Sequence, residues 1–227
     1  MGIAQYVQDS DETFPMGYYF MNGGSKFVPW GDMIRPYTKS GDVYSNGQST
    51  MRGGIFTCPS TPADFQDGNY GYNRDLMPQT DWTGKLDWDV VTLSDIPTPT
   101  DKIGFMDKGT SDGSQNAYYF VNEEWYWTDY IAYNAATGTG TRDGMSLALV
   151  NGDCDMKADP NKTPPSWGVM YGSCATLPRF RHTRTTNAIF LDGHAKAMTR
   201  GSIQWFKNIY LPVNQSKEWT RQGWYPY

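Results

Sequence analysis

The segment Arg181-His-Thr-Arg-Thr-Thr-Asn-Ala-Ile-Phe-Leu-Asp-Gly-His-Ala-Lys-Ala-Met198 carries the strongest local structural signal of the chain and both of its histidines. An apolar run from Asn187 to Leu191 leads into Asp192-Gly193, and an alternating run from His194 to Met198 follows. Two such runs around an Asp-Gly pair predict a β-hairpin. A type I′ turn is expected at its tip, because that turn needs positive φ at both central residues.

Three titratable residues of this segment, His182, Asp192 and His194, could act together. The hairpin tip would hold Asp192 and His194 close, and a loop folding back could bring His182 to either. Two imidazoles and a carboxylate could bind a transition metal. The alternatives are that His182 hydrogen-bonds the Asp-Gly turn and fastens the preceding loop over the hairpin, or that it faces solvent. Structural zinc sites need four ligands, and no fourth has diagnostic spacing, so the fastening role is favoured.

The spacing of His182, nine residues and Asp192-Gly193 resembles the H-X9-DG element of a family of prepilin-type, processing-associated proteins that are similar to type II secretion pseudopilins. Three other segments resemble the same family in the same order. They are the end of its N-terminal helix (2–15), its Cys-Pro-Ser segment (Phe56-Thr-Cys58-Pro59-Ser60) and a Tyr-Asn step (Tyr70-Gly-Tyr-Asn73). The resemblance implies a structural motif made of His182, Asp192, Gly193, Cys58 and Pro59.

The resemblance also implies a fold and a location. The expected fold is α+β and pilin-like: a single soluble domain over 1–227, with the stub of an N-terminal helix (1–14) packed on an antiparallel β-sheet and a loop-rich insertion from about 107 to 174. No run approaches the roughly 20 apolar residues that span a bilayer. The family's membrane-embedded helix is therefore expected before Met1, either removed or missed by a late start site.

The function implied by the resemblance is assembly. The chain is expected to be a structural subunit of a type II secretion or type IV pilus-like assembly, in the periplasm or at the cell surface. The full-length precursor would be anchored in the inner membrane, processed and methylated. Other pseudopilin or pilin subunits and the secretion machinery would be its partners.

Hydrophobic spacing predicts the main elements. Ile3, Tyr6 and Val7 fall on one helix face, and the segment from Asp9 to Asp11 with Pro15 ends the pattern. About two turns of helix are marginal in water, so this face must rest on the domain. The remaining segments are read as a short helix closed by Pro36 (Trp30–Tyr37), the end of a strand (Phe56–Pro59) and two strands (Lys102–Asp107 and Ala117–Val121).

Composition narrows the class of protein. The 227 residues carry a formal net charge of −5, with 38% hydrophobic residues, 24 Gly and 14 Pro, which is typical of a loop-rich, largely β, extracytoplasmic protein. Nucleic acid is not an expected partner, because phosphate binding needs clustered Lys and Arg. The nearest approach to a cluster, Arg179, Arg181 and Arg184, is read as a solvated face.

The three cysteines lack the C-x-x-C spacing of zinc or redox motifs. In an oxidising compartment Cys154 and Cys174 form the favoured disulfide, which would stabilise the fold by about 3 kcal/mol. Cys58 is left over. The family often carries a cysteine ahead of the helix end, so the resemblance implies a partner for Cys58 before Met1.

An acidic loop is the candidate calcium site. Asp153, Asp155 and Asp159 offer oxygen ligands at alternate positions, as calcium loops do. The loop departs from an EF-hand, with Met156 where Gly is required and Lys162 where the bidentate Glu belongs. No cofactor is required by the sequence, calcium is the possible one, and the acidic turn 107–112 is a weaker candidate for a calcium site.

Catalysis is not expected. Ser146 is not in a G-x-S-x-G elbow, Cys174 with His182 and Asp192 would form a triad only by coincidence, and adjacent Glu123 and Glu124 of a strand face opposite ways. The sequence therefore predicts no enzyme.

The aromatic residues support an alternative function. Exposed Trp faces stack on sugar rings, so Trp125, Trp127, Trp219 and Trp224 could bind polysaccharide. The favoured explanation is a core built from large residues together with subunit contacts. If the tryptophans bind polysaccharide, the chain would be a surface-anchored carbohydrate-binding module with a pilin-type anchor.

Overall fold

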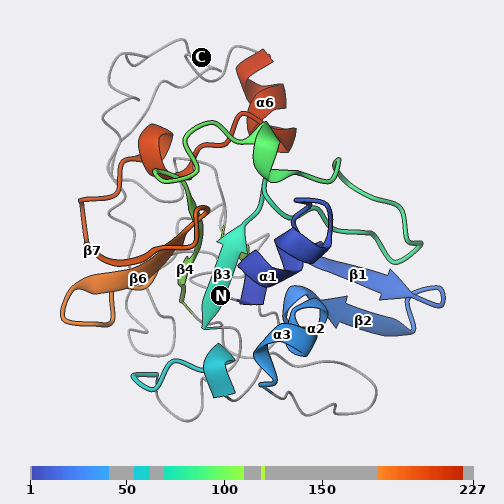
Figure 1. Ribbon diagram of the computed structural model, residues 1–227, viewed down its shortest axis with the longest axis horizontal. Helices are drawn as coiled ribbons and strands as arrows, with labels where there is room; N and C mark the ends of the chain where they lie inside the picture. Colours follow the sequence, from blue (N-terminus) through green and yellow to red (C-terminus); the bar gives the residue numbers. More distant parts are fainter. Residues whose placement is uncertain (1, 41–53, 62–68, 110–118, 121–177, 222–227) are drawn as a thin grey trace, which may run out of the picture.

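The computed structural model describes residues 2–40, 54–61, 69–109, 119–120 and 178–221. Their largest element is a five-stranded sheet of order β5-β3-β4-β6-β7 (Figure 1). Its strands are β3 (Tyr70–Asn73), β4 (Ile103–Asp107), β5 (Tyr119–Phe120), β6 (Thr185–Phe190) and β7 (Ala195–Thr199). Strands β3, β4, β6 and β7 pair antiparallel with their neighbours, and β5 runs parallel to β3. The predicted α+β class with an antiparallel sheet is confirmed.

The hairpin predicted around Asp192-Gly193 is confirmed, but its turn type is wrong. Strands β6 and β7 pair from Thr185 with Thr199 to Ile189 with Ala195. Gly193 has φ +93°, whereas Asp192 is not among the residues with positive φ. The Gly193 N–H donates to the Phe190 carbonyl at 2.9 Å, and the Phe190 N–H donates to the His194 carbonyl. This is a three-residue loop, a type I turn followed by a left-handed glycine, which is the second common way to close a hairpin.

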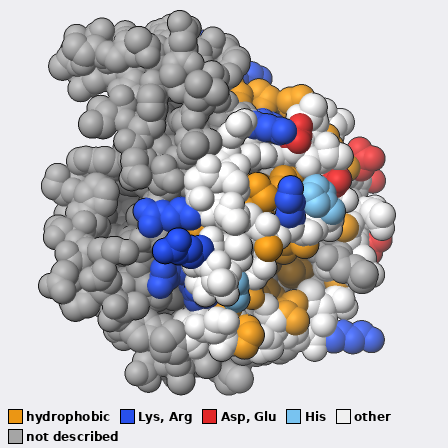
Figure 2. All heavy atoms as spheres, turned by 90° about the vertical axis from the view of Figure 1, so that its left-hand side faces the viewer, with side chains coloured by type: hydrophobic (Ala, Val, Ile, Leu, Met, Phe, Trp, Pro, Cys, Tyr) orange, Lys and Arg blue, Asp and Glu red, His pale blue; other side chains and the backbone are white. Residues whose placement is uncertain are grey.

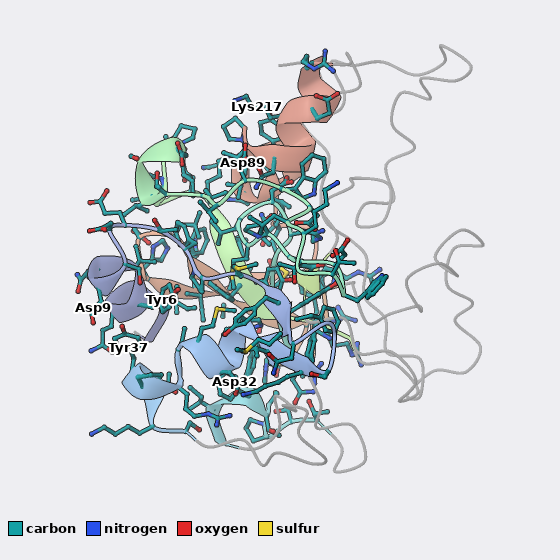
Figure 3. All side chains as sticks on the ribbon, turned by 90° about the vertical axis from the view of Figure 1, so that its right-hand side faces the viewer. Tyr6, Asp9, Asp32, Tyr37, Asp89 and Lys217 are labelled. Atoms are coloured by element: carbon teal, nitrogen blue, oxygen red, sulfur yellow. The ribbon has the colours of Figure 1, made fainter. Side chains whose placement is uncertain are left out.

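The predicted N-terminal helix is present as α1 (Gly2–Asp9) and rests on the domain as expected. Val7 is buried, and Ile3 and Tyr6 pack against the core cluster. Tyr6 meets the ring of Tyr37 edge-on at 6.2 Å, which joins α1 to α3 (Arg35–Thr38), as Figure 3 shows. The helix ends where Asp11 and Glu12 take positive φ, and the Glu12 N–H donates to the Val7 carbonyl.

The segment Trp30–Tyr37 forms two short helices instead of one. Helix α2 covers Trp30–Met33, and Pro36 lies in the first turn of α3. The prediction that Pro36 closes a helix is wrong. A proline fits the first turn of a helix, because the N–H that it lacks would be unpaired there anyway. Helix α3 ends at Thr38, and the capping residue Lys39 that follows has φ +50°.

A second hairpin, which the sequence analysis did not predict, lies beside these helices. Strands β1 (Tyr18–Met21) and β2 (Lys26–Pro29) pair antiparallel and project from the helices in Figure 1. Asn22, Gly23 and Gly24 all have positive φ in the connecting loop. The aromatic side chains Tyr18, Phe20 and Phe27 contact one another along the ribbon.

The other described elements are short. The predicted strand end at Phe56–Pro59 is wrong, because the 3₁₀ helix η1 (Gly54–Phe56) and a turn occupy this position. Further elements are η3 (Leu93–Asp95), the π-helical turn η6 (Trp205–Ile209) and α6 (Asn214–Arg221). Strand β4 confirms the strand expected at 102–107, and β5 lies within the strand expected at 117–121. Most of the expected insertion, about 107–174, lies outside the described residues.

The main core lies between α1, α2 and one face of the sheet. Tyr72, Phe105 and Ile189 are neighbours in register and therefore share that face. Trp30 packs on Phe105 with ring centroids 5.2 Å apart, and further large residues complete the cluster. In the part of the chain that is described, no helix has both the length and the apolar character needed to cross a membrane.

Candidate functional site

The two ends of the H-X9-DG element lie at opposite ends of strand β6. His182 precedes the strand and Asp192 follows it. Six strand residues extend about 20 Å, so the nine-residue spacing corresponds to one crossing of the sheet. Figure 2 shows histidine atoms at two separate places on the face near β6 and β7. The expected hydrogen bond from His182 to the Asp-Gly turn is therefore wrong, as is a metal site that combines His182 with Asp192 and His194.

At the turn, Asp192 pairs with His194 and not with His182. The carboxylate Oδ1 lies 2.6 Å from His194 Nδ1, and both side chains are largely exposed, at 30% and 45%. The imidazole of His194 stacks on the ring of Phe190. This pair is a surface feature of the hairpin.

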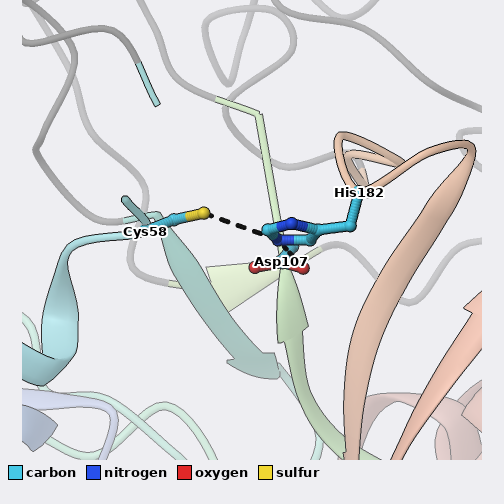
Figure 4. Close-up of side chains that lie close together, drawn as sticks. All are labelled: Cys58, Asp107 and His182. Carbon is cyan, nitrogen blue, oxygen red and sulfur yellow. Dashed lines mark hydrogen bonds and ion pairs between the residues drawn. The ribbon is translucent and has the colours of Figure 1, made fainter. Parts of the chain in front are cut away.

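His182 instead meets Asp107 and Cys58 (Figure 4). Its Nε2 lies 3.2 Å from Asp107 Oδ2 and 3.5 Å from Cys58 Sγ. On the other side of the ring, Nδ1 lies 3.5 Å from the hydroxyl of the exposed residue Ser60. Cys58 and Asp107 have no exposed surface, and the His182 side chain is 26% exposed. Residues far apart in the sequence therefore form one cluster, which we call the Cys58–Asp107–His182 cluster.

Each residue of the cluster is positioned by backbone hydrogen bonds. Asp107 ends β4, and its Oδ2 accepts the N–H of Asn187 on β6 at 2.8 Å. The N–H of Cys58 donates to Asn69 Oδ1 at 2.8 Å, just before β3. His182 and Thr185 exchange two backbone hydrogen bonds of 3.0 Å at the start of β6. The cluster thus depends on the alignment of three neighbouring strands.

Burial governs the electrostatics of the cluster. It raises the pKa of Asp107, and the Asn187 N–H and the charges of His182 and Arg181 offset part of this effect. Burial also raises the pKa of Tyr70 to about 12, with further contributions from Asp107 and Cys58. The expectation that Arg181 belongs to a solvated face is wrong. Its guanidinium donates to the Thr61 hydroxyl and the Lys108 carbonyl.

The arrangement does not suit nucleophilic catalysis. In a triad the acid and the nucleophile use opposite nitrogens of the imidazole. Here Cys58 and Asp107 both approach Nε2, and a thiol without exposed surface has no access to a substrate. Ser60 does approach the other nitrogen, but 3.5 Å is long for a working hydrogen bond. The donor set of thiol, imidazole and carboxylate is instead typical of transition-metal ligands.

Several predicted sites are not tested. The disulfide residues Cys154 and Cys174, the calcium ligands Asp153, Asp155 and Asp159, and the tryptophans Trp125, Trp127 and Trp224 all lie outside the described residues. Trp219 lies in α6, whose side chain at that position is also not described. Polysaccharide binding stays a prediction, and tryptophan fluorescence titrated with a polysaccharide panel would test it.

The family resemblance implied that Cys58, Pro59 and His182 belong to one motif, but no sequence pattern indicated Asp107 as their partner. Asp107 appeared only as the end of a predicted strand and the start of an acidic turn. Pro59 is exposed beside the cluster, and Gly193 closes the distant hairpin. Comparison with protein-family models, with curated proteins and with solved structures finds no match to this chain.

Proposed function

We propose that this chain is the extracytoplasmic domain of a pseudopilin-like structural subunit, which takes part in a type II secretion or type IV pilus-like assembly at the cell envelope. The observation that carries the proposal is the position of α1. This helix packs its apolar face against a core that includes residues of an antiparallel sheet, whose strands β3, β4, β6 and β7 are neighbours in that order. A pilin-type subunit needs this arrangement, because its helix must both anchor the domain and pack in a filament.

The convergence of the family-like segments supports the same proposal. The Cys-Pro-Ser segment and His182 meet in the Cys58–Asp107–His182 cluster. The Tyr-Asn step forms β3, where Tyr70 is in register with Asp107 and the buried Asn73 amide donates to the Ile209 carbonyl at 2.8 Å. Segments that resemble one family separately thus contribute to one structural unit.

In this proposal the chain works by assembly. A hydrophobic helix continuous with α1 would precede it, hold the precursor in the inner membrane and later pack in the filament core. Val7 faces the domain, whereas Gln5 on the opposite side of α1 is exposed. That exposed side would contact neighbouring pilin-like subunits, and the sheet domain would be displayed outside.

Site-specific photo-crosslinking in the native cells tests this proposal. A photo-reactive amino acid at position 5 should form crosslinks to a pilin-like subunit, and these should disappear in cells without prepilin peptidase. The matched control is position 196 on β7, where Lys196 is equally exposed but distant from α1. Equal crosslinking from both positions, or crosslinks that persist without the peptidase, would contradict the proposal.

A further inference from the structure

We propose that Cys58, Asp107 and His182 bind one zinc ion as three of its ligands. Within the described part of the chain, these residues are the group of three potential ligands whose donor atoms all lie within 4.8 Å of one another. The inference does not depend on the proposed function, because assembly through α1 needs no metal.

The distances in the cluster fit a tetrahedral ion. Zinc bonds of about 2.3 Å to sulfur and 2.0 to 2.1 Å to nitrogen or oxygen separate S and N ligands by about 3.6 Å, and N and O ligands by about 3.3 Å. The observed separations are 3.5 Å from Cys58 Sγ to His182 Nε2 and 3.2 Å from Nε2 to Asp107 Oδ2. Both edges therefore match, and the sulfur and the carboxylate also lie within the 4.8 Å that contains all three donor atoms.

The direction of the side chains also fits. Figure 4 shows that the three side chains point toward one another from separate parts of the fold. Both contacts reach the same imidazole nitrogen, Nε2, whose lone pair would be the ligand. A hydrogen-bonded catalytic relay would use both nitrogens, whereas metal binding needs only one.

An unpaired buried oxygen supplies an independent observation. Asp107 has no exposed surface, and its Oδ1 has no hydrogen-bond partner among the described residues. The Asn187 N–H and His182 both approach the other oxygen, Oδ2. A buried carboxylate oxygen without a partner is costly, and a bound cation would compensate for it. Thiolate sulfur and imidazole nitrogen beside it favour zinc over the oxygen-seeking ions calcium and magnesium.

The test uses the whole 227-residue chain, reduced and freed of metal by a chelator. Titration with Zn²⁺ against a chromophoric chelator should give one equivalent bound, and Co²⁺ should produce a thiolate-to-cobalt charge-transfer band. Cys58→Ser and His182→Ala should each raise the zinc Kd by about 100-fold or more, since second-shell changes alone cost 10- to 100-fold. His194→Ala is the matched control and should leave the Kd unchanged.

Two results would overturn the zinc site. One is the absence of the charge-transfer band in the unaltered chain, a result that does not depend on whether any variant folds. The other is an unchanged zinc Kd in folded Cys58→Ser, or an equal loss of affinity in His194→Ala. Neither result bears on the crosslinks from α1, so the zinc site and the proposed assembly function can fail separately.

Discussion

His182 and His194 each face one aspartate, but the two pairs differ in burial. Asp107 is fully buried and is contacted through Oδ2, whereas Asp192 is exposed at the hairpin tip. Removal of His182 would leave the Asp107 carboxylate with fewer partners in a site that water does not reach. A buried polar group without its partner costs about 1 to 3 kcal/mol, and exposed ion pairs contribute about 0 to 1 kcal/mol.

We therefore predict that His182→Ala lowers the free energy of unfolding by about 2 kcal/mol in the presence of a chelator. His194→Ala should change it by less than about 0.5 kcal/mol, as surface substitutions do. Urea unfolding of both variants beside the original chain measures the difference. Equal stability of the two variants would show that the cluster does not hold the loop before β6 in place.

Lys102 is a second buried residue whose charge depends on the fold. It is 6% exposed, and burial lowers its pKa to about 8 although Asp101 acts in the opposite direction. Its ammonium lies 5.8 Å from the centre of the Tyr210 ring, a contact that also favours the charged form. Burial is the larger effect, so the folded chain binds fewer protons at this site than the unfolded chain, in which the pKa is near 10.5.

Stability should consequently rise with pH between about 8 and 9.5. The unfolded state binds more protons in this range, so the free energy of unfolding increases, by about 1 kcal/mol over the interval. Lys102→Met keeps the apolar stem and should abolish this increase. Urea unfolding at several pH values below the range where tyrosines ionise compares the two chains. A parallel pH dependence in both would contradict the assignment.

Contacts between individual residues of the cluster could not be predicted from the sequence. Asp107 lies 49 positions after Cys58 and 75 before His182. No local pattern could indicate that they meet, because the pairing of β4 with β6 brings them together. The spacing between His182 and Asp192 suggested a contact, but the extended strand between them separates the two side chains.

The turn after β6 depends on the left-handed conformation of one glycine. Gly193 has φ +93°, and a Cβ there would meet no atom within 4 Å. A substitution would therefore act through backbone strain alone. A left-handed conformation costs a residue with a Cβ about 1 to 2 kcal/mol, and Asn tolerates it better than Ala.

We predict that Gly193→Ala lowers the free energy of unfolding by about 1 kcal/mol and that Gly193→Asn lowers it by less. Thermal unfolding of the two variants measures the order. A Gly193→Ala variant as stable as the original chain would contradict the three-residue loop described for this hairpin.

Local signals explain which elements could be predicted. The Asp-Gly pair and the apolar run before it identified β6 and β7, although the turn proved to be one residue longer than expected. The same kind of signal, Asn22-Gly23 between aromatic runs, lies before β2 and indicates the hairpin of β1 and β2. Pro36 misled the helix prediction because the same residue can end a helix or begin one.

Two features define the whole molecule: the antiparallel strands β3, β4, β6 and β7, which are neighbours in that order, and an N-terminal helix that packs on the same core. The spacing of Ile3, Tyr6 and Val7 predicted that the helix needs the domain. The sheet order was not predictable, because it depends on pairings between β3, β4 and β6 across long intervening segments.

The mature N-terminus of the protein is the sharpest test of whether the chain is a pilin-like subunit. Mass spectrometry of the protein isolated from the cells that make it should find an N-methylated apolar residue upstream of Gly2, followed by a hydrophobic helix that continues into α1. An unmethylated N-terminus with no apolar segment before α1 would contradict the assignment to a pilin-like assembly.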